Sequence, residues 1–123
     1  MKLDDSFAED FESACKDNSG GRIELAAITR FPWDQVLVIR PYQMPAGLRY
    51  REAKALRHLG IMDSDGICAL VFRSDAGAPR IVAFPRSRVD LAKVEMNSYT
   101  PTTAVFDVES QDDGRLILRT VLE

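Results

Sequence analysis

The stretch Gln35-Val36-Leu37-Val38-Ile39-Arg40 decides the fold, because it is apolar on both faces and rich in β-branched residues. Such a run is typical of a strand that is covered on both faces of its sheet. Phe31-Pro32-Trp33-Asp34 precedes the run and Pro41 and Pro45 follow it. Proline cannot donate a hydrogen bond to a strand ladder, so these prolines bound the run on both sides. The sequence therefore predicts a central strand here.

The segment just upstream predicts a second strand. Residues 22–29 alternate, with Ile23, Leu25 and Ala27 on one side and charged or small residues on the other. This period of two is typical of a half-buried strand. Because only a short proline-containing turn separates it from the central strand, we expect the two strands to pair as a hairpin.

Two segments predict helices. Residues 6–17 begin with the Ser-x-x-Glu pattern of a capping box and end before Gly20-Gly21. Residues 46–59 are rich in alanine, arginine and leucine, with Pro45 just ahead and Gly60 just beyond. The first helix also carries an apolar stripe at four-residue spacing, made of Leu3, Phe7, Phe11 and Cys15.

The second half of the chain predicts two further hairpins. Residues 66–73 and 80–84 are apolar runs separated by a turn that contains Gly77 and Pro79. Residues 102–109 and 115–122 flank an Asp-Gly turn, and the first of them alternates as a strand with one wet face does. Between the hairpins, residues 86–90 are expected to form a loop or a short helical turn.

These elements predict an α+β fold. Adjacent hairpin strands cannot form parallel crossovers, so we expect a largely antiparallel sheet of about six strands with two helices on one face. The chain has 123 residues and no internal repeat or linker, which is typical of a single domain over residues 1–123.

Composition narrows the function. The formal net charge is −3, which argues against a dedicated nucleic-acid binder. The middle of the chain is nevertheless basic, with Arg49, Arg51, Lys54, Arg57, Arg80, Arg86, Arg88 and Lys93. The sequence shows neither the pattern of a secretory signal nor an apolar run near the roughly 20 residues of a membrane helix. We therefore expect a cytoplasmic protein with no membrane partner, in which Cys15 and Cys68 stay reduced.

Motifs for catalysis or metal binding do not stand out. The single histidine, His58, has no partner nearby in sequence and suits the end of its predicted helix. One histidine and two distant cysteines do not make a zinc set. Asp63-Ser64-Asp65-Gly66 resembles the start of a calcium loop, but position 74 carries serine where the loop needs glutamate. We therefore expect no catalytic residue, no metal and no cofactor, and a protein that is not an enzyme.

Trp33-Asp34-Gln35-Val36 followed by Pro41-Tyr42 is the most distinctive motif. Trp33 either anchors the edge of the core, with Asp34 accepting backbone amides in the turn, or forms an exposed aromatic pair with Tyr42 beside a binding groove. Over residues 28–85 the chain resembles a broad group of small bacterial proteins with Trp-Asp-x-Val and Pro-Tyr. The resemblance implies a shared fold and names no activity, although such proteins are similar in size and acidity to toxin-immunity proteins.

These observations favour an immunity (antitoxin-like) protein that binds and neutralises a cognate bacterial toxin domain. A non-enzymatic adaptor, a secretion chaperone or a regulatory binding module is the alternative, and an enzyme that uses carboxylates and arginines is a third. Acidic side chains suit a basic partner. The predicted partner-binding residues lie on the last hairpin: Asp107, Glu109, Asp112 and Asp113. A second acidic group lies on the first helix: Asp4, Asp5, Glu9, Asp10 and Glu12.

Overall fold

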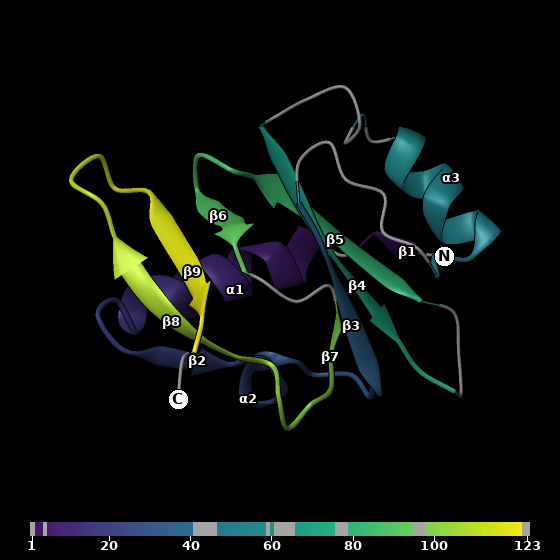
Figure 1. Cartoon of the computed structure of the whole chain (residues 1–123), viewed down its shortest axis with the longest axis horizontal. Helices are drawn as coiled ribbons and strands as arrows, with labels where there is room; N and C mark the ends of the chain where they lie inside the picture. Colours follow the sequence, from purple (N-terminus) through teal and green to yellow (C-terminus); the bar gives the residue numbers. More distant parts are fainter. Residues whose placement is uncertain are drawn as a thin grey trace.

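The structure is a computed structural model that describes residues 2–3, 5–40, 47–58, 60, 66–75, 79–94 and 98–121. These residues form a five-stranded sheet, in the order β1-β5-β4-β3-β7, and a four-stranded sheet, in the order β2-β8-β9-β6 (Figure 1). In chain order the elements are β1 (Lys2–Leu3), α1 (Asp5–Asp17), β2 (Arg22–Glu24), α2 (Leu25–Ile28), β3 (Gln35–Ile39), α3 (Tyr50–His58), β4 (Ile67–Arg73), β5 (Arg80–Pro85), β6 (Val89–Lys93), β7 (Ser98–Tyr99), β8 (Val105–Ser110) and β9 (Leu116–Thr120).

The predicted central strand is confirmed as β3, an interior strand of the five-stranded sheet. It pairs antiparallel with β4 along its whole length and with β7 at Val36 and Leu37. Its side chains alternate between two cores, with Val36 and Val38 in one and Leu37 and Ile39 in the other. Burial of both faces explains why this strand reads as an unbroken apolar run.

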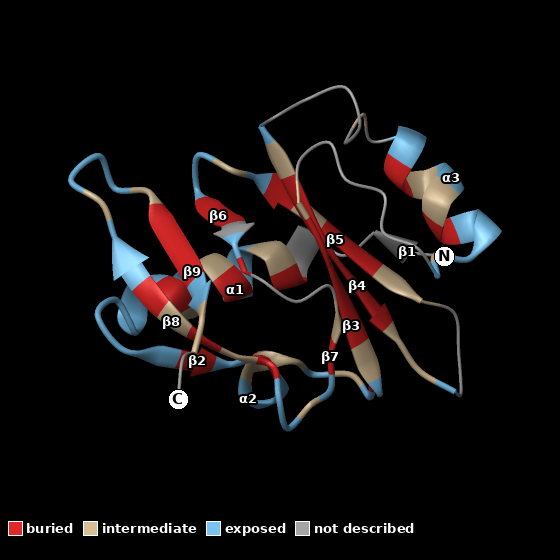
Figure 2. Ribbon diagram, in the orientation of Figure 1, coloured by how far each residue is buried: buried red, intermediate tan, exposed pale blue. Residues whose placement is uncertain are grey.

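The α+β class and the mostly antiparallel pairing are confirmed, but the prediction of one sheet of about six strands is wrong. The two helices also do not share a face. Phe7, Phe11 and Cys15 of α1 join the inner side of the four-stranded sheet in the core on one face of the five-stranded sheet. Leu56 of α3 packs into the core on the opposite face. The five-stranded sheet is therefore covered on both faces, by α3 on one and by α1 together with the four-stranded sheet on the other, and α1 keeps one side exposed (Figure 2).

The predicted hairpin of residues 22–29 with β3 is also wrong. Only Arg22–Glu24 forms a strand there, β2, and it pairs antiparallel with β8 in the other sheet. The chain turns into α2 at Leu25, where the backbone N–H of Thr29 donates to the carbonyl oxygen of Leu25 over 3.1 Å. Alanine favours the helix over the strand, so the Ala26-Ala27 pair supports this turn. The segment then crosses from one sheet to the other.

Other boundaries match the predictions in part. Helix α1 and the β4–β5 hairpin are confirmed, while α3 begins at Tyr50, later than expected. Residues 89–93 form β6, paired parallel with β9, where a loop or helical turn was expected for 86–90. The short strands β1 and β7 were not predicted.

The last predicted hairpin is confirmed as β8–β9. Asp107 lies opposite Arg119, and Ser110 lies opposite Leu116 beside the turn. Gly114 closes this turn with a φ of 88°, in the left-handed region that glycine adopts without steric cost. None of the helices in the described part of the chain is long and apolar enough to span a membrane.

Cys15 and Cys68 are both free and completely buried. Burial, aided by the charge of Glu12, raises the pKa of the Cys15 thiol to about 12. Burial likewise raises the pKa of the Cys68 thiol to about 11. The thiolate is the reactive form of cysteine, and a raised pKa keeps both thiols protonated at neutral pH. Both side chains are therefore unreactive in the folded protein.

Alkylation should therefore label neither thiol quickly in the native protein and both thiols after unfolding without a reductant. Mass spectrometry of the intact protein counts the labels. A protein that takes up no label under denaturing, non-reducing conditions would carry a disulfide and contradict this structure.

Candidate functional site

The predicted partner-binding carboxylates divide into a stem and a tip of the β8–β9 hairpin. In the stem, Asp107 accepts a hydrogen bond from Nε of Arg22 over 3.0 Å. Glu109 accepts one from Nε of Arg119 over 2.8 Å. The exposed face of the four-stranded sheet therefore carries positive and negative side chains in alternation. The carboxylates of Asp107 and Glu109 on this face are both ion-paired.

The tip of the hairpin is different. Asp112 and Asp113 are exposed, and neither has an ion-pair partner within the residues that the structure describes. Asp113 accepts the backbone N–H of Arg115 through Oδ1 over 3.0 Å, which orders the turn. The turn lies at one end of the molecule's long axis (Figure 1). Among the described residues of this hairpin, the carboxylates without an ion pair thus lie at its end.

The stem that holds the tip is firmly packed. Phe106 and Val108 of β8 and Leu116 and Leu118 of β9 point into the core and are buried. Phe106 also meets the ring of Tyr99 edge-on, with centroids 5.0 Å apart. A tip on such a stem has little conformational entropy to lose on binding, which favours affinity.

The second predicted acidic group, on α1, is only partly free. Glu12 lies 4.0 Å from Nζ of Lys16 and 3.8 Å from Nη1 of Arg88. Glu9 and Asp10 are exposed on the same helix and form no ion pair with any residue described. Asp4 lies outside the described residues, and the side chain of Asp5 is not described. Glu9 and Asp10 therefore remain the rival acidic surface.

Comparisons of the chain with protein-family models, with curated proteins and with solved structures find no match. The function is therefore inferred from the chain's own residues.

The Trp33-Asp34 motif has a structural role. Trp33 is 7% exposed, and its indole Nε1 donates to Oγ1 of Thr29 over 2.9 Å. Its ring packs edge-on against Phe72 of β4, with centroids 5.2 Å apart. Asp34 accepts a hydrogen bond from the backbone N–H of Asp75 through Oδ2 over 2.9 Å. It therefore stabilises the turn that follows β4, and not the turn before β3 in which Asp34 itself lies. Pro41 and Tyr42 lie outside the described residues.

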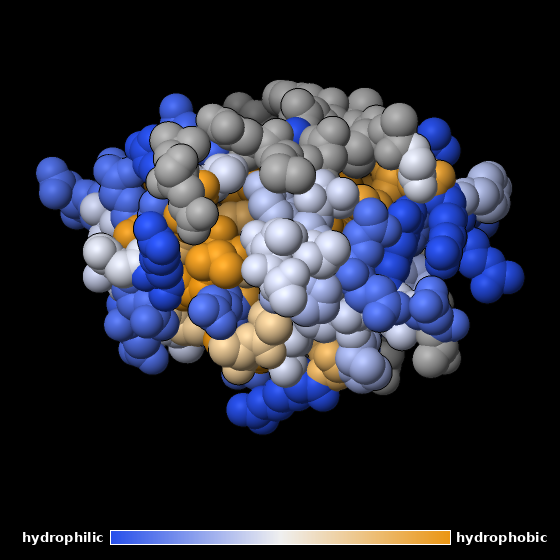
Figure 3. All heavy atoms as spheres, turned by 60° about the horizontal axis from the view of Figure 1, so that its bottom comes forward, coloured by the Kyte–Doolittle hydropathy of each residue, from blue (hydrophilic) through white to orange (hydrophobic). Residues whose placement is uncertain are grey.

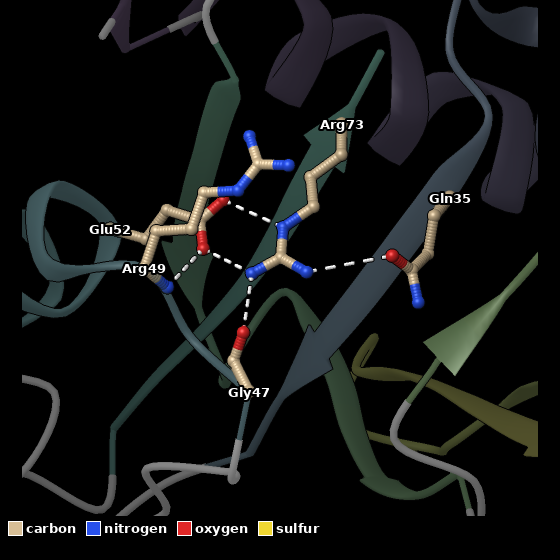
Figure 4. Close-up of polar contacts among 5 residues, drawn as sticks. All are labelled: Gln35, Gly47, Arg49, Glu52 and Arg73. Atoms are coloured by element: carbon tan, nitrogen blue, oxygen red, sulfur yellow. Dashed lines mark hydrogen bonds and ion pairs between the residues drawn. The ribbon is translucent and has the colours of Figure 1, made fainter. Parts of the chain in front are cut away.

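A buried carboxylate that sequence reasoning missed lies between α3 and β4. Glu52 is completely buried, and its two oxygens accept hydrogen bonds from Nε and Nη2 of Arg73 and from the backbone N–H of Arg49 (Figure 4). Arg73 also donates to the carbonyl oxygen of Gly47 over 2.9 Å. Burial alone would raise the pKa of the Glu52 carboxyl, but these hydrogen bonds and the Arg73 charge outweigh burial and lower it.

This pairing indicates a structural role for Glu52. Each carboxylate oxygen is already engaged, and an ionised, arginine-paired carboxylate is a poor proton acceptor. The buried carboxylate of Asp90 is likewise held by Nε of Arg86, over 2.9 Å. His58 is exposed at the end of α3. Among the described residues, no group of three or more His, Cys, Asp or Glu side chains is placed to hold a metal ion.

The arginines that pair with these carboxylates differ in how well the sequence predicts their position. The turn signal predicts that residues 115–122 pair back on residues 102–109, but it does not give the register. A two-residue Asp113-Gly114 loop would place Thr120 opposite Asp107, whereas Asp112 joins the loop and Arg119 lies opposite Asp107. The sequence places Arg22 in a different predicted hairpin, so its ion pair with Asp107 is seen only in the structure. Glu52 and Arg73 are far apart in sequence, and only the docking of α3 brings them together.

Proposed function

We propose that this protein is an immunity protein that binds and neutralises a cognate toxin domain, and that the tip of the β8–β9 hairpin enters a basic cleft of that toxin. The observation that carries the proposal is the pair of exposed carboxylates Asp112 and Asp113, which form no ion pair with a described residue and lie at the end of a hairpin whose stem is packed into the core. A clustered negative charge raises the rate at which a basic partner is captured. Toxins that act on nucleic acid provide such a basic cleft, because their substrate is a polyanion.

The neutral stem supports this assignment. Arg22 and Arg119 cancel the charges of Asp107 and Glu109, so the hairpin attracts a basic surface at its tip and presents a balanced face along its side. An exposed ion pair contributes only about 0–1 kcal/mol to stability, so this row of charges does little for the fold. We therefore assign the stem residues to positioning and the tip residues to contact.

Co-expression tests the function itself. A toxin domain encoded beside this gene should kill when expressed alone and be harmless when this protein is present. If the domain is harmless alone, or if it kills equally in both cases, the protein is not its immunity partner.

Reversal of the tip charge tests the surface. Asp112→Lys with Asp113→Lys should slow association with the toxin domain by about tenfold or more, because steering by the tip is reversed. Rescue in the co-expression assay should weaken in parallel. The melting temperature should fall only slightly, because the one hydrogen bond lost, from the Arg115 N–H to Asp113, is exposed to water. Association rates are measured by stopped-flow mixing or surface plasmon resonance.

The matched control changes the charge by the same amount on α1. Glu9→Lys with Asp10→Lys should leave the association rate within about twofold of the wild type, because α1 is not the contact surface. If the α1 variant loses rescue and the tip variant keeps it, the contact lies on α1 instead. If both variants rescue fully, neither acidic surface binds the toxin.

A further inference from the structure

Helix α3 lies at the opposite end of the molecule from the β8–β9 hairpin (Figure 1). Hydrophilic side chains cover both ends of the long axis in Figure 3, but the two ends differ in charge. The hairpin ends in Asp112 and Asp113, whereas Arg49, Arg51, Lys54 and Arg57 are all exposed on or beside α3. The protein is therefore acidic overall and basic at one helix.

The spacing of residues along α3 places Lys54 and Arg57 on one side together with Tyr50, and Arg51 lies next to that side, about 100° around the helix from Tyr50. Tyr50, Lys54 and Arg57 follow at intervals of four and three, which places them on one face of the helix. Glu52 and Leu56 are buried on the opposite face. The only acid in α3 is thus removed from the surface, and its charge is offset by Arg73.

Arg51, Lys54 and Arg57 have no ion-pair partner in the described segments of the chain. The Glu52–Arg73 pair joins α3 to β4 and holds the opposite face of the helix against the sheet. The Tyr50 side chain is 75% exposed and is the one large hydrophobic residue exposed among the residues described. Tyrosine and arginine are the residue types that most often dominate protein–protein interfaces.

We propose that the outward face of α3 (Arg51, Tyr50, Lys54 and Arg57) is a second protein-binding surface, which takes an acidic segment of a partner protein. Arginine side chains pair with carboxylates through two parallel hydrogen bonds, and the Tyr50 ring supplies apolar contact between the charges. The helix of nine residues is about 13 Å long, which matches a short peptide segment.

Charge favours an acidic protein segment over nucleic acid as the occupant. The chain carries a net charge of −3, with exposed acids on α1 and on the hairpin tip. A long polyanion would meet these charges as well as α3, whereas a short acidic segment meets α3 alone. This surface is separate from the hairpin tip, so it goes beyond the proposed toxin contact and is tested without the toxin.

Fluorescence anisotropy with the full-length chain tests the proposal. The probe is a labelled peptide of glutamate and aspartate residues interspersed with leucine, and the comparison peptide has glutamine and asparagine in place of the acids. The acidic peptide should bind at least about tenfold more tightly, and raising the salt from about 0.05 M to about 0.3 M should weaken it, because exposed charges are screened. Equal binding of the two peptides overturns the proposal.

Variants then locate the surface. Lys54→Glu with Arg57→Glu should weaken acidic-peptide binding about tenfold, and Tyr50→Ala should weaken it without changing its salt dependence. The matched control, Lys16→Glu with Lys93→Glu, makes the same charge change at exposed sites elsewhere and should bind as the wild type does. If the control weakens binding as much as the α3 variant does, the effect is overall charge and the surface is not α3.

Two further measurements test whether the variants stay folded and whether the partner is a protein or a nucleic acid. Circular dichroism should show unchanged melting for these surface variants, and Lys54→Gln with Arg57→Gln replaces the reversal if that variant unfolds. Labelled double-stranded DNA and single-stranded RNA are measured at the same salt concentrations. Tighter binding of either nucleic acid than of the acidic peptide, lost in the α3 variant, would make the partner a nucleic acid and overturn the proposal.

Discussion

Replacing Trp33 by alanine is expected to lower the free energy of unfolding by about 3–5 kcal/mol, the range for deleting a large buried aromatic side chain. The indole is 7% exposed and rests edge-on against Phe72, which also meets Phe7 and Phe31 edge-on. Removal therefore leaves a cavity in an aromatic cluster that joins β4 to α1. It also leaves Oγ1 of Thr29 without its indole donor.

Urea unfolding followed by circular dichroism measures this loss. Tryptophan fluorescence is unsuitable because Trp33 is the only tryptophan in the chain. Trp33→Phe is the matched control: it keeps an aromatic ring against Phe72 and gives up the hydrogen bond to Thr29, so it should cost clearly less. An unchanged unfolding midpoint for Trp33→Ala would show that the ring lies at the surface.

Replacing Glu52 by alanine is expected to be comparably damaging, at about 3–5 kcal/mol, because the change leaves the Arg73 guanidinium without its carboxylate in a buried setting. The Arg73 side chain is 14% exposed and the Glu52 side chain 0%. The substitution also frees the backbone N–H of Arg49, which Glu52 accepts over 2.8 Å at the start of α3. We expect α3 to detach first, since this cluster joins it to β4.

Glu109→Ala provides the control for burial. Glu109 also accepts a hydrogen bond from an arginine Nε, at 2.8 Å, but both side chains of that pair are 47% exposed. Its removal should cost about 0–1 kcal/mol. Equal losses for Glu52→Ala and Glu109→Ala would mean that the Glu52 cluster is open to water.

The pH dependence has a definite sign. The folded state lowers the pKa of the Glu52 carboxyl. Its stabilising contribution is therefore complete above the ordinary glutamate pKa of about 4.3 and is lost as the pH falls through the lower, folded-state pKa. The stability difference between the wild type and Glu52→Gln should accordingly shrink below about pH 4. A difference that stays constant down to about pH 2 would contradict the pairing.

Several helices and strands could be predicted from the pattern of neighbouring residues alone. The four-residue spacing of Phe7, Phe11 and Cys15 predicts α1, and the Asp-Gly turn predicts the β8–β9 hairpin, although not its register. The unbroken apolar run of β3 predicts a strand covered on both faces. In each case the signal lies within a few residues, where the period of the side chains and the turn geometry fix the local structure.

The sequence by itself thus determined the α+β class, the central strand, the last two hairpins and the acidic hairpin tip. Tertiary structure alone decided the split into two sheets, the placement of α1 and α3 on opposite faces, and the pairing of β2 with β8. It also decided which charges are paired, since Arg22, Arg73 and Arg119 each contact a carboxylate on a different helix or strand from their own. The reason is that the spacing of apolar residues shows which faces of a segment are buried. Which helix or strand covers each face depends on packing between segments that are distant in sequence.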